Sequence, residues 1–156
     1  MTRFPAPLAA LAAGALLLGL GVPAGAATSG SAAAVPPIAL GRWVNPKHTV
    51  IVDTAPCGDR LCGTVACAAP AAIEKAREKG TPQLIGTQLL ERLELRSDGR
   101  WRGKVFVPDM QGRFGAVMTQ LSPDRIEVKG CILGGLLCKK QVWTRTVPNS
   151  CAALRY

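Results

Sequence analysis

Short stretches in which apolar and polar residues alternate recur along most of the chain, and this period of two is typical of β-strands. The alternation is clearest over residues 100–107, where one face carries Trp101, Gly103, Val105 and Val107 and the other carries Arg100, Arg102 and Lys104. Turn-forming triplets such as Ser97-Asp98-Gly99 separate these stretches. The pattern predicts about seven or eight short strands between residues 43 and 145.

The last two predicted strands form a hairpin within residues 124–145. Its turn falls at Gly134-Gly135, because consecutive glycines supply the positive φ of a tight hairpin turn. Cys131 then lies opposite Cys138. Directly opposed residues have Cα atoms about 4.5 to 5.5 Å apart, which is within disulfide reach. The spacing therefore predicts a hairpin with a covalent staple.

Two further segments need a choice between helix and strand. Residues 68–80 contain alanines and then charged residues before Gly80, which predicts a short helix over the barrel rim. A helix is also possible for residues 88–96, but Pro82, Gly86 and the turn that follows favour a strand there.

Sequential hairpins of this number fit an up-and-down barrel or a sandwich. Closure removes edge strands that invite pairing with another chain. We therefore predict an all-β fold, a small antiparallel up-and-down barrel. Gly103, Gly115 and Ala116 are expected to face inward, where small residues let a barrel taper or leave a cavity.

The N-terminal residues have the features of a signal peptide. Arg3 precedes an apolar run at residues 8–22, and Ala24-Gly25-Ala26 matches a cleavage pattern. The run is shorter than the roughly 20 residues of a membrane span, so no anchor is expected after cleavage. The predicted organisation is a signal peptide (1–26), a flexible lead (27–37) and one domain (38–156), in the periplasm or secreted.

Six cysteines in an exported chain predict three disulfides. Cys57 and Cys62 close a second short loop, and Cys67 and Cys151 remain by elimination, which requires the C-terminal tail to cross back. Zinc binding is the alternative, but the spacing of Cys57, Cys62 and Cys67 is not that of a zinc knuckle, and His48 is the only histidine. No metal or cofactor is expected.

The net charge of +9 at pH 7 favours acidic partners, or serves solubility alone. The basic residues are scattered, with no run longer than Lys139-Lys140, and few aromatic residues could stack on bases. Nucleic-acid binding is therefore not expected.

Several motifs together resemble an exported bacterial family called domain of unknown function 2147. They lie within residues 41–145 and read G-R-W-V-N-P, R-L-C-G-T-V, Q-L-I-G, W-R-G-K-V-F-V-P-D-M-Q-G-R-F and V-K-G-C-I-L-G-G-L-L-C-K-K-Q-V-W-T-R. The resemblance implies a lipocalin-like, calycin-type barrel and supplies no established activity. An Asp followed by Asn-Pro, usual in the family before the central glycine, is missing from residues 68–83 here.

Gly41-x-Trp43 near the start and Arg145 near the end also resemble the structural signature of calycins. In that signature the tryptophan plugs one barrel end and an arginine from the last strand covers it. The resemblance thus implies structural roles for Gly41, Trp43 and Arg145.

No catalytic residue is expected. A Ser-His-Asp or Cys-His mechanism would need His48, and no nucleophile motif lies near it. We expect a non-catalytic binder of an apolar or amphipathic ligand, with an anionic ligand as one option, that enters opposite Trp43. The alternatives are an envelope module that uses its basic surfaces on an acidic polymer or protein, an unrecognised enzyme, and a barrel filled by Trp101, Phe106, Phe114 and the leucines. The sequence indicates no oligomeric state.

Overall fold

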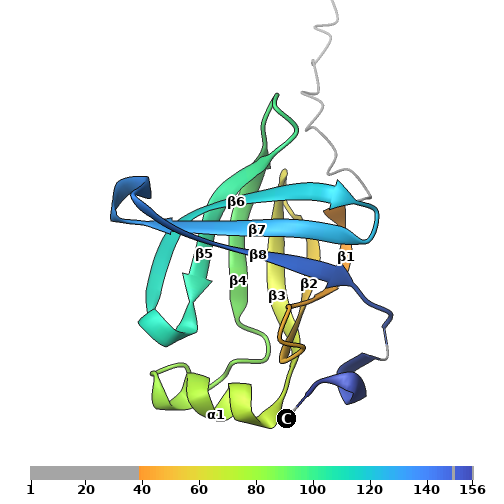
Figure 1. The fold of residues 1–156 in the computed structure, drawn as a ribbon, viewed down its shortest axis with the longest axis vertical. Coiled ribbons are helices and arrows are strands. Elements are labelled where there is room, and N and C mark those ends of the chain that lie inside the picture. Colours follow the sequence, from red (N-terminus) through yellow and green to blue (C-terminus); the bar gives the residue numbers. More distant parts are fainter. Residues whose placement is uncertain (1–38, 149, 156) are drawn as a thin grey trace, which may run out of the picture. The chain divides into compact units, whose positions relative to one another are not determined.

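The computed structural model describes residues 39–148 and 150–155, which all belong to one compact unit. Within them, eight antiparallel strands form a closed barrel in which each strand pairs with the next and β1 pairs with β8 (Figure 1). The predicted barrel is therefore confirmed. The expected signal peptide (1–26) and flexible lead (27–37) lie outside the described residues.

The strands are β1 (Gly41–Val44), β2 (Val50–Cys57), β3 (Arg60–Ala68), β4 (Gln88–Leu95), β5 (Trp101–Val107), β6 (Gly112–Ser122), β7 (Arg125–Ile132) and β8 (Leu137–Arg145). One α-helix, α1 (Pro70–Glu78), follows β3. Short 3-10 turns are η2 (Pro108–Met110), η3 (Leu133–Gly135) and η4 (Ser150–Ala153). None of the helices in this part of the chain has the length and apolar character needed to cross a bilayer.

The connections between strands gather at two ends of the barrel. The Trp43 end carries the start of β1 and the turns at residues 58–59, 96–100 and 123–124. The η3 end carries the connections at residues 45–49, 69–87, 108–111 and 133–136. Each end therefore has its own set of loops, and α1 belongs to the η3 end.

Both predicted helix-or-strand choices are confirmed. Residues 88–95 form β4, and the alanine-rich segment forms α1, which begins at Pro70, where a missing backbone N–H costs no hydrogen bond. Ala76 of α1 is buried against Val65 of β3 and Leu84. Helix α1 thus covers the η3 end on the side of β3.

The register of the β7–β8 hairpin is the predicted one, with Cys131 opposite Cys138 and Ile132 opposite Leu137. Gly134 and Gly135 have φ of 66° and 101°, and the N–H of Leu136 donates to the carbonyl of Leu133 at 3.3 Å. The positive φ values are those that glycine adopts without strain.

Two expectations about side-chain direction are wrong. Ala116 is buried, but Gly115 is exposed on the outer face, because neighbouring strand residues point to opposite faces. Phe106 also faces outward, where Arg113 lies over its ring at 5.1 Å. Strand β2 begins at Val50, and His48 lies exposed in the turn before it with φ of 54°.

Candidate functional site

The three signature residues meet at the Trp43 end. The indole of Trp43 is fully buried and donates its Nε1–H to Oγ1 of Thr54 at 2.9 Å. The guanidinium carbon of Arg145 lies 4.2 Å from the Trp43 ring centroid. A Cβ atom at Gly41, whose φ is 132°, would collide with Nη1 of Arg145. Glycine at position 41 therefore leaves room for the arginine.

Hydrogen bonds to the backbone hold Arg145 in this position. Its Nε donates to the carbonyl of Pro123 at 2.7 Å, and its Nη1 donates to the carbonyl of Leu40 at 2.8 Å. The hydroxyl of Thr54 in turn lies 2.7 Å from the carbonyl of Ala39. These polar groups are used within the protein, so the cluster acts as a plug for this end of the barrel.

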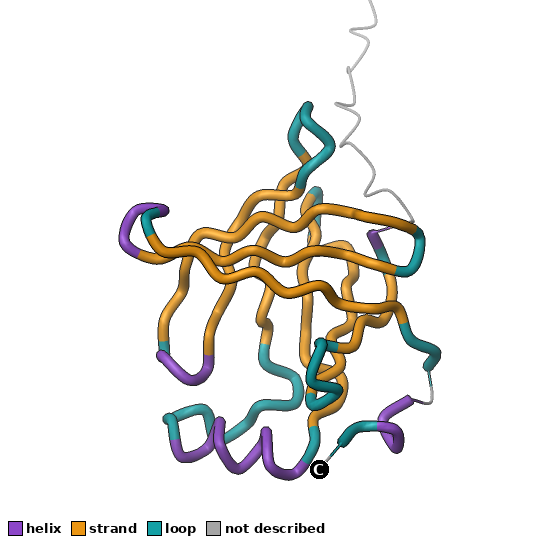
Figure 2. The backbone as a smooth tube through the Cα atoms, viewed as in Figure 1, coloured by secondary structure: helices purple, strands orange, loops and turns teal. Residues whose placement is uncertain are grey.

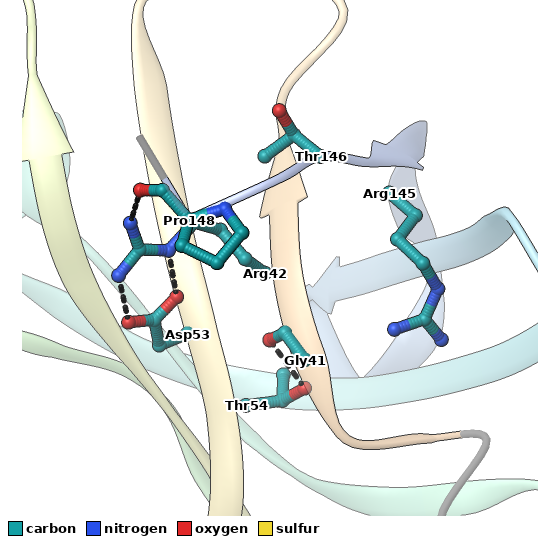
Figure 3. Close-up of a pocket in the computed structure, with 7 residues that line it drawn as sticks. All are labelled: Gly41, Arg42, Asp53, Thr54, Arg145, Thr146 and Pro148. Atoms are coloured by element: carbon teal, nitrogen blue, oxygen red, sulfur yellow. Dashed lines mark hydrogen bonds and ion pairs between the residues drawn. The ribbon is translucent and has the colours of Figure 1, made fainter. Parts of the chain in front are cut away.

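A shallow hollow of about 460 Å³ lies beside the plug (Figure 3), lined by Gly41, Arg42, Asp53, Thr54, Arg145, Thr146 and Pro148. Arg42 donates from Nε and Nη2 to the two carboxylate oxygens of Asp53, both at 2.7 Å, and from Nη1 to the carbonyl of Pro148. The hydrogen bond to Asp53 raises the pKa of Arg42 above its ordinary value. Arg42 and Asp53 neutralise each other in this hollow, and Arg145 is held by backbone carbonyls, which leaves little to attract a ligand.

The inner face of the β7–β8 hairpin changes from buried to exposed along its length. Its residues are Ile126, Val128, Gly130 and Ile132 on β7, opposite Trp143, Gln141, Lys139 and Leu137 on β8. Ile126 is 0% exposed and its partner Trp143 7%, whereas Leu137 is 58% exposed. The barrel is therefore packed near Trp43 and uncovered near η3.

Strands β5 and β6 show the same change. Trp101 and Met118, which are register partners, are buried, whereas Val105 and its partner Phe114 are only half-buried. A Cβ atom at Gly130 would lie 3.0 Å from Cγ1 of Val105, so glycine at this position makes room for the side chain of Val105 on the inner face. We call this half-exposed inner surface the mouth, and it comprises Val105, Val107, Phe114, Ile132, Leu137, Lys139 and Gln141.

Helix α1 covers the other side of the η3 end. Lys75 of α1 forms an ion pair with Asp109 of η2, and Nε2 of Gln111 donates to Oγ1 of Thr81 at 2.6 Å. These contacts tie the segment that follows β3 to the β5–β6 connection (Figure 1). The mouth is thus bounded by a helix on one side and by the β7–β8 hairpin on the other.

The mouth contains two polar side chains on an otherwise apolar surface. The side-chain oxygen of Gln141 accepts the Nε1–H of Trp143 at 3.0 Å. Within the part of the chain that the structure describes, Lys139 forms no ion pair, whereas its outer-face neighbour Lys140 pairs with Glu127 at 3.4 Å. In the sequence, Lys139 stands out only as part of the basic dipeptide Lys139-Lys140. Counting alternate positions back from Trp143 would have placed it on the inner face.

All six cysteines are paired, as Cys57–Cys62, Cys67–Cys151 and Cys131–Cys138. These are the pairs expected from the sequence. The second disulfide brings the C-terminal tail back to β3, where Leu154 is buried in a cluster with Val44 and Ile51. Each cysteine sulfur is therefore part of a disulfide, and the three disulfides connect elements of the barrel.

The described residues contain no group of three or more His, Cys, Asp or Glu side chains that could hold a metal ion. His48 lies exposed in the β1–β2 connection. Asp53 lies within β2 and pairs with Arg42. The mouth therefore presents an apolar surface with one cation, Lys139, at its edge.

One comparison with solved structures supports the fold. A solved structure, protein HP1028 from the human pathogen Helicobacter pylori, described as belonging to the lipocalin family, matches with a TM-score of 0.56 and 13% identity, over 76% of this chain and 90% of that chain. No curated protein matches. A family model described as an uncharacterized protein conserved in bacteria matches residues 41–145. The chain therefore belongs to the bacterial family known as domain of unknown function 2147.

Proposed function

We propose that this protein is a non-catalytic binder that takes one small, amphipathic and anionic molecule into the mouth. The observation that carries the proposal is the gradient of exposure along the inner face, from buried Ile126 and Trp143 to exposed Leu137. A barrel of eight strands is just wide enough to hold packed side chains or one small ligand. In this barrel, the tightly packed interior ends before strands β7 and β8 reach the η3 turn.

The apolar part of the ligand would cover Val105, Phe114 and Ile132, which are half-buried on the inner face. Removing apolar surface from water stabilises a complex by about 25 cal/mol per Å². Covering about 150 Å² of such surface would therefore contribute about 4 kcal/mol before the cost of association. This supports an alkyl or aromatic group as the inner part of the ligand.

The charged part of the ligand would meet Lys139. This lysine lies on the inner face opposite Gly130, with Gln141 two residues further along the same face. An ammonium group beside an amide can bind a carboxylate, sulfate or phosphate through charge-assisted hydrogen bonds. The expected ligand therefore carries its negative charge at one end.

The disulfides support a location outside the cytoplasm. Three disulfides persist in an oxidising compartment, and the family is bacterial. Both observations support export to the periplasm or the exterior. The protein would therefore bind its ligand outside the cytoplasm.

Two measurements test this proposal. Native mass spectrometry of protein purified without denaturation should reveal a copurified amphiphile of defined mass. Titration with a dansyl-labelled undecanoic acid should give one saturable site, and Lys139→Gln should weaken binding by about five- to tenfold, equivalent to about 1 to 1.4 kcal/mol.

Lys140→Gln is the matched control, because Lys140 is the next residue but lies on the outer face opposite Lys129. It should leave the affinity unchanged. Absence of saturable binding to the native protein, or an equal loss in both variants, would contradict a site in the mouth.

A further inference from the structure

Three large apolar side chains stand exposed at the tip of the β7–β8 hairpin. Leu133 is 72% exposed, Leu136 88% and Leu137 58%. The tip lies at the far end of two long strands and its contacts are chiefly with those strands (Figure 2). Single exposed leucines are ordinary, but three within five consecutive residues form an apolar patch that favours leaving water.

A disulfide, two glycines and a backbone hydrogen bond fix the conformation of the tip. The Cys131–Cys138 disulfide joins the two strands immediately behind it, with the Cα atoms 4.0 Å apart. Gly134 and Gly135 occupy the positive φ values of the turn, and the Leu136 N–H to Leu133 carbonyl hydrogen bond closes it. The tip would therefore lose little conformational entropy if it moved from water into an apolar environment.

Lysines surround the hairpin just behind the leucines. Lys129 lies opposite Lys140 on the outer face, and Lys139 lies on the inner face. Because a strand rises about 3.3 Å per residue, Lys140 is about 10 Å along the strand from Leu137. Lys140 also pairs with Glu127, but the Lys140 side chain is 71% exposed, and such a pair contributes only about 1 kcal/mol or less. The leucine tip thus carries a collar of positive charge on both faces.

We propose that this tip docks on the surface of a lipid bilayer that contains anionic headgroups. The headgroup region is about 5 to 7 Å deep on each side of the hydrocarbon core. With the leucines at the edge of the hydrocarbon, the backbone at Lys140 would lie just outside a headgroup region of this depth, and its flexible side chain would extend toward the leucines to reach the lipid phosphates. Docking of this kind is peripheral and does not need a spanning segment.

A bilayer fits these observations better than a protein groove. The tip is a convex turn with cations on both sides, and anionic headgroups can surround such a shape, whereas a groove would have to match both faces at once. Docking by this surface does not require a ligand in the mouth. Leu137 and Lys139 belong to both surfaces, so a docked hairpin would bring the mouth close to the membrane.

The test is cosedimentation of the purified protein with vesicles. Vesicles of phosphatidylcholine and phosphatidylglycerol in equal parts should bind the protein, and pure phosphatidylcholine vesicles should bind it at least about tenfold more weakly. Leu136→Ser should weaken binding to the mixed vesicles by about tenfold or more, because one leucine no longer enters the apolar layer. Lys129→Gln combined with Lys140→Gln should also weaken it by about tenfold and reduce its salt dependence.

Leu121→Ser is the matched control, because Leu121 is 51% exposed but lies near the Trp43 end. All variants keep the same N-terminus, so differences between them report the hairpin. In Leu136→Trp, tryptophan emission should shift to the blue when the mixed vesicles are added.

Equal binding of Leu136→Ser, Leu121→Ser and the native protein would overturn the proposal. So would a native protein that dimerises through the tip, with Leu136→Ser monomeric and neither bound to vesicles. Because no soluble amphiphile is used, failure here leaves the proposed ligand site in the mouth standing, and the reverse also holds.

Discussion

Arg145 covers the indole of Trp43, with 4.2 Å between its guanidinium carbon and the ring centroid, and the two residues are register partners on β8 and β1. The first and last strands of the domain therefore meet through one aromatic and one cationic side chain. Strand β1 has only four residues, so few backbone hydrogen bonds close the barrel at this seam. The side-chain pair is what strengthens it.

Trp43→Ala should lower the free energy of unfolding by about 3 to 5 kcal/mol, as expected for deletion of a buried large aromatic side chain. Arg145→Lys should cost about 1 to 3 kcal/mol, because lysine cannot stack a planar group on the indole and hydrogen-bond the carbonyls of Pro123 and Leu40 together. Denaturant unfolding of Arg145→Lys can be monitored by tryptophan fluorescence. Circular dichroism can monitor the unfolding of both variants.

Arg113→Lys is the control for the arginine. Arg113 lies over Phe106 at 5.1 Å, but its side chain is 59% exposed. The change should therefore stay within about 0.5 kcal/mol. If Arg113→Lys and Arg145→Lys were equally harmful, the special position of Arg145 over the plug would be refuted.

The three disulfides should differ in how much they stabilise the protein. Cys67 and Cys151 are 84 residues apart, whereas Cys131 and Cys138 are 7 apart. In the loop-entropy model, closing the longer loop stabilises the folded state by about 4 to 5 kcal/mol and the shorter by about 2 to 3 kcal/mol. Thermal unfolding of the two double Cys→Ser variants should therefore show the larger loss for Cys67 and Cys151.

A non-reducing peptide map accompanies that experiment, because the ranking has meaning only if the pairs are those described. Fragments that join Cys131 to Cys138 and Cys67 to Cys151 are expected. Free thiols, or any fragment that joins Cys131 to another cysteine, would rule out the hairpin register.

Much of the fold could be predicted because independent local signals agreed. At the β7–β8 hairpin, the glycine pair fixes the turn, and that turn alone sets Cys131 opposite Cys138. At β4, Gly86 and the turn at Ser97-Asp98-Gly99 bound a segment whose composition would also permit a helix. Where turn chemistry and alternation specify the same register, the strand pairing follows without knowledge of the tertiary structure.

The open mouth could not be predicted in the same way. Alternation assigns Val105, Phe114 and Lys139 to the inner face, but it does not say whether another element covers them. That depends on where α1 crosses the η3 end, which is set by tertiary contacts such as that between Gln111 and Thr81. The pairing of Arg42 with Asp53 was missed for a related reason, since the partners lie on different strands and meet only once the register is known.

Gly103 and Gly115 test the corrected assignment of inner and outer faces. A Cβ atom at Gly103 would lie 2.7 Å from the carbonyl oxygen of Glu91, whereas a Cβ atom at Gly115 would meet nothing within 4 Å. Gly103→Ala should therefore destabilise the protein by about 1 to 3 kcal/mol through overpacking. Gly115→Ala should be neutral or stabilising by up to about 1 kcal/mol, because the unfolded chain loses freedom. Melting temperatures distinguish them, and a similar loss in both would return Gly115 to the interior.

Phe114 and Phe106 provide a test of the mouth that uses one residue type on two faces. Both rings are half-buried, but Phe114 lies on the inner face opposite Val105, and Phe106 on the outer face opposite Arg113. Phe114→Ala should weaken binding of dansyl-labelled undecanoic acid by about tenfold, because an apolar wall of the mouth is removed. Phe106→Ala should leave the affinity as it is.

Both substitutions should lower stability by less than the 3 to 5 kcal/mol or so of a fully buried phenylalanine, since neither ring is fully buried. Unfolding curves recorded beside the titrations therefore separate loss of the ligand site from loss of the fold. The affinities of Phe114→Ala and Phe106→Ala are therefore compared under conditions in which both variants are folded. A weaker affinity in Phe106→Ala than in Phe114→Ala would place the ligand on the outside of the barrel and end the case for the mouth.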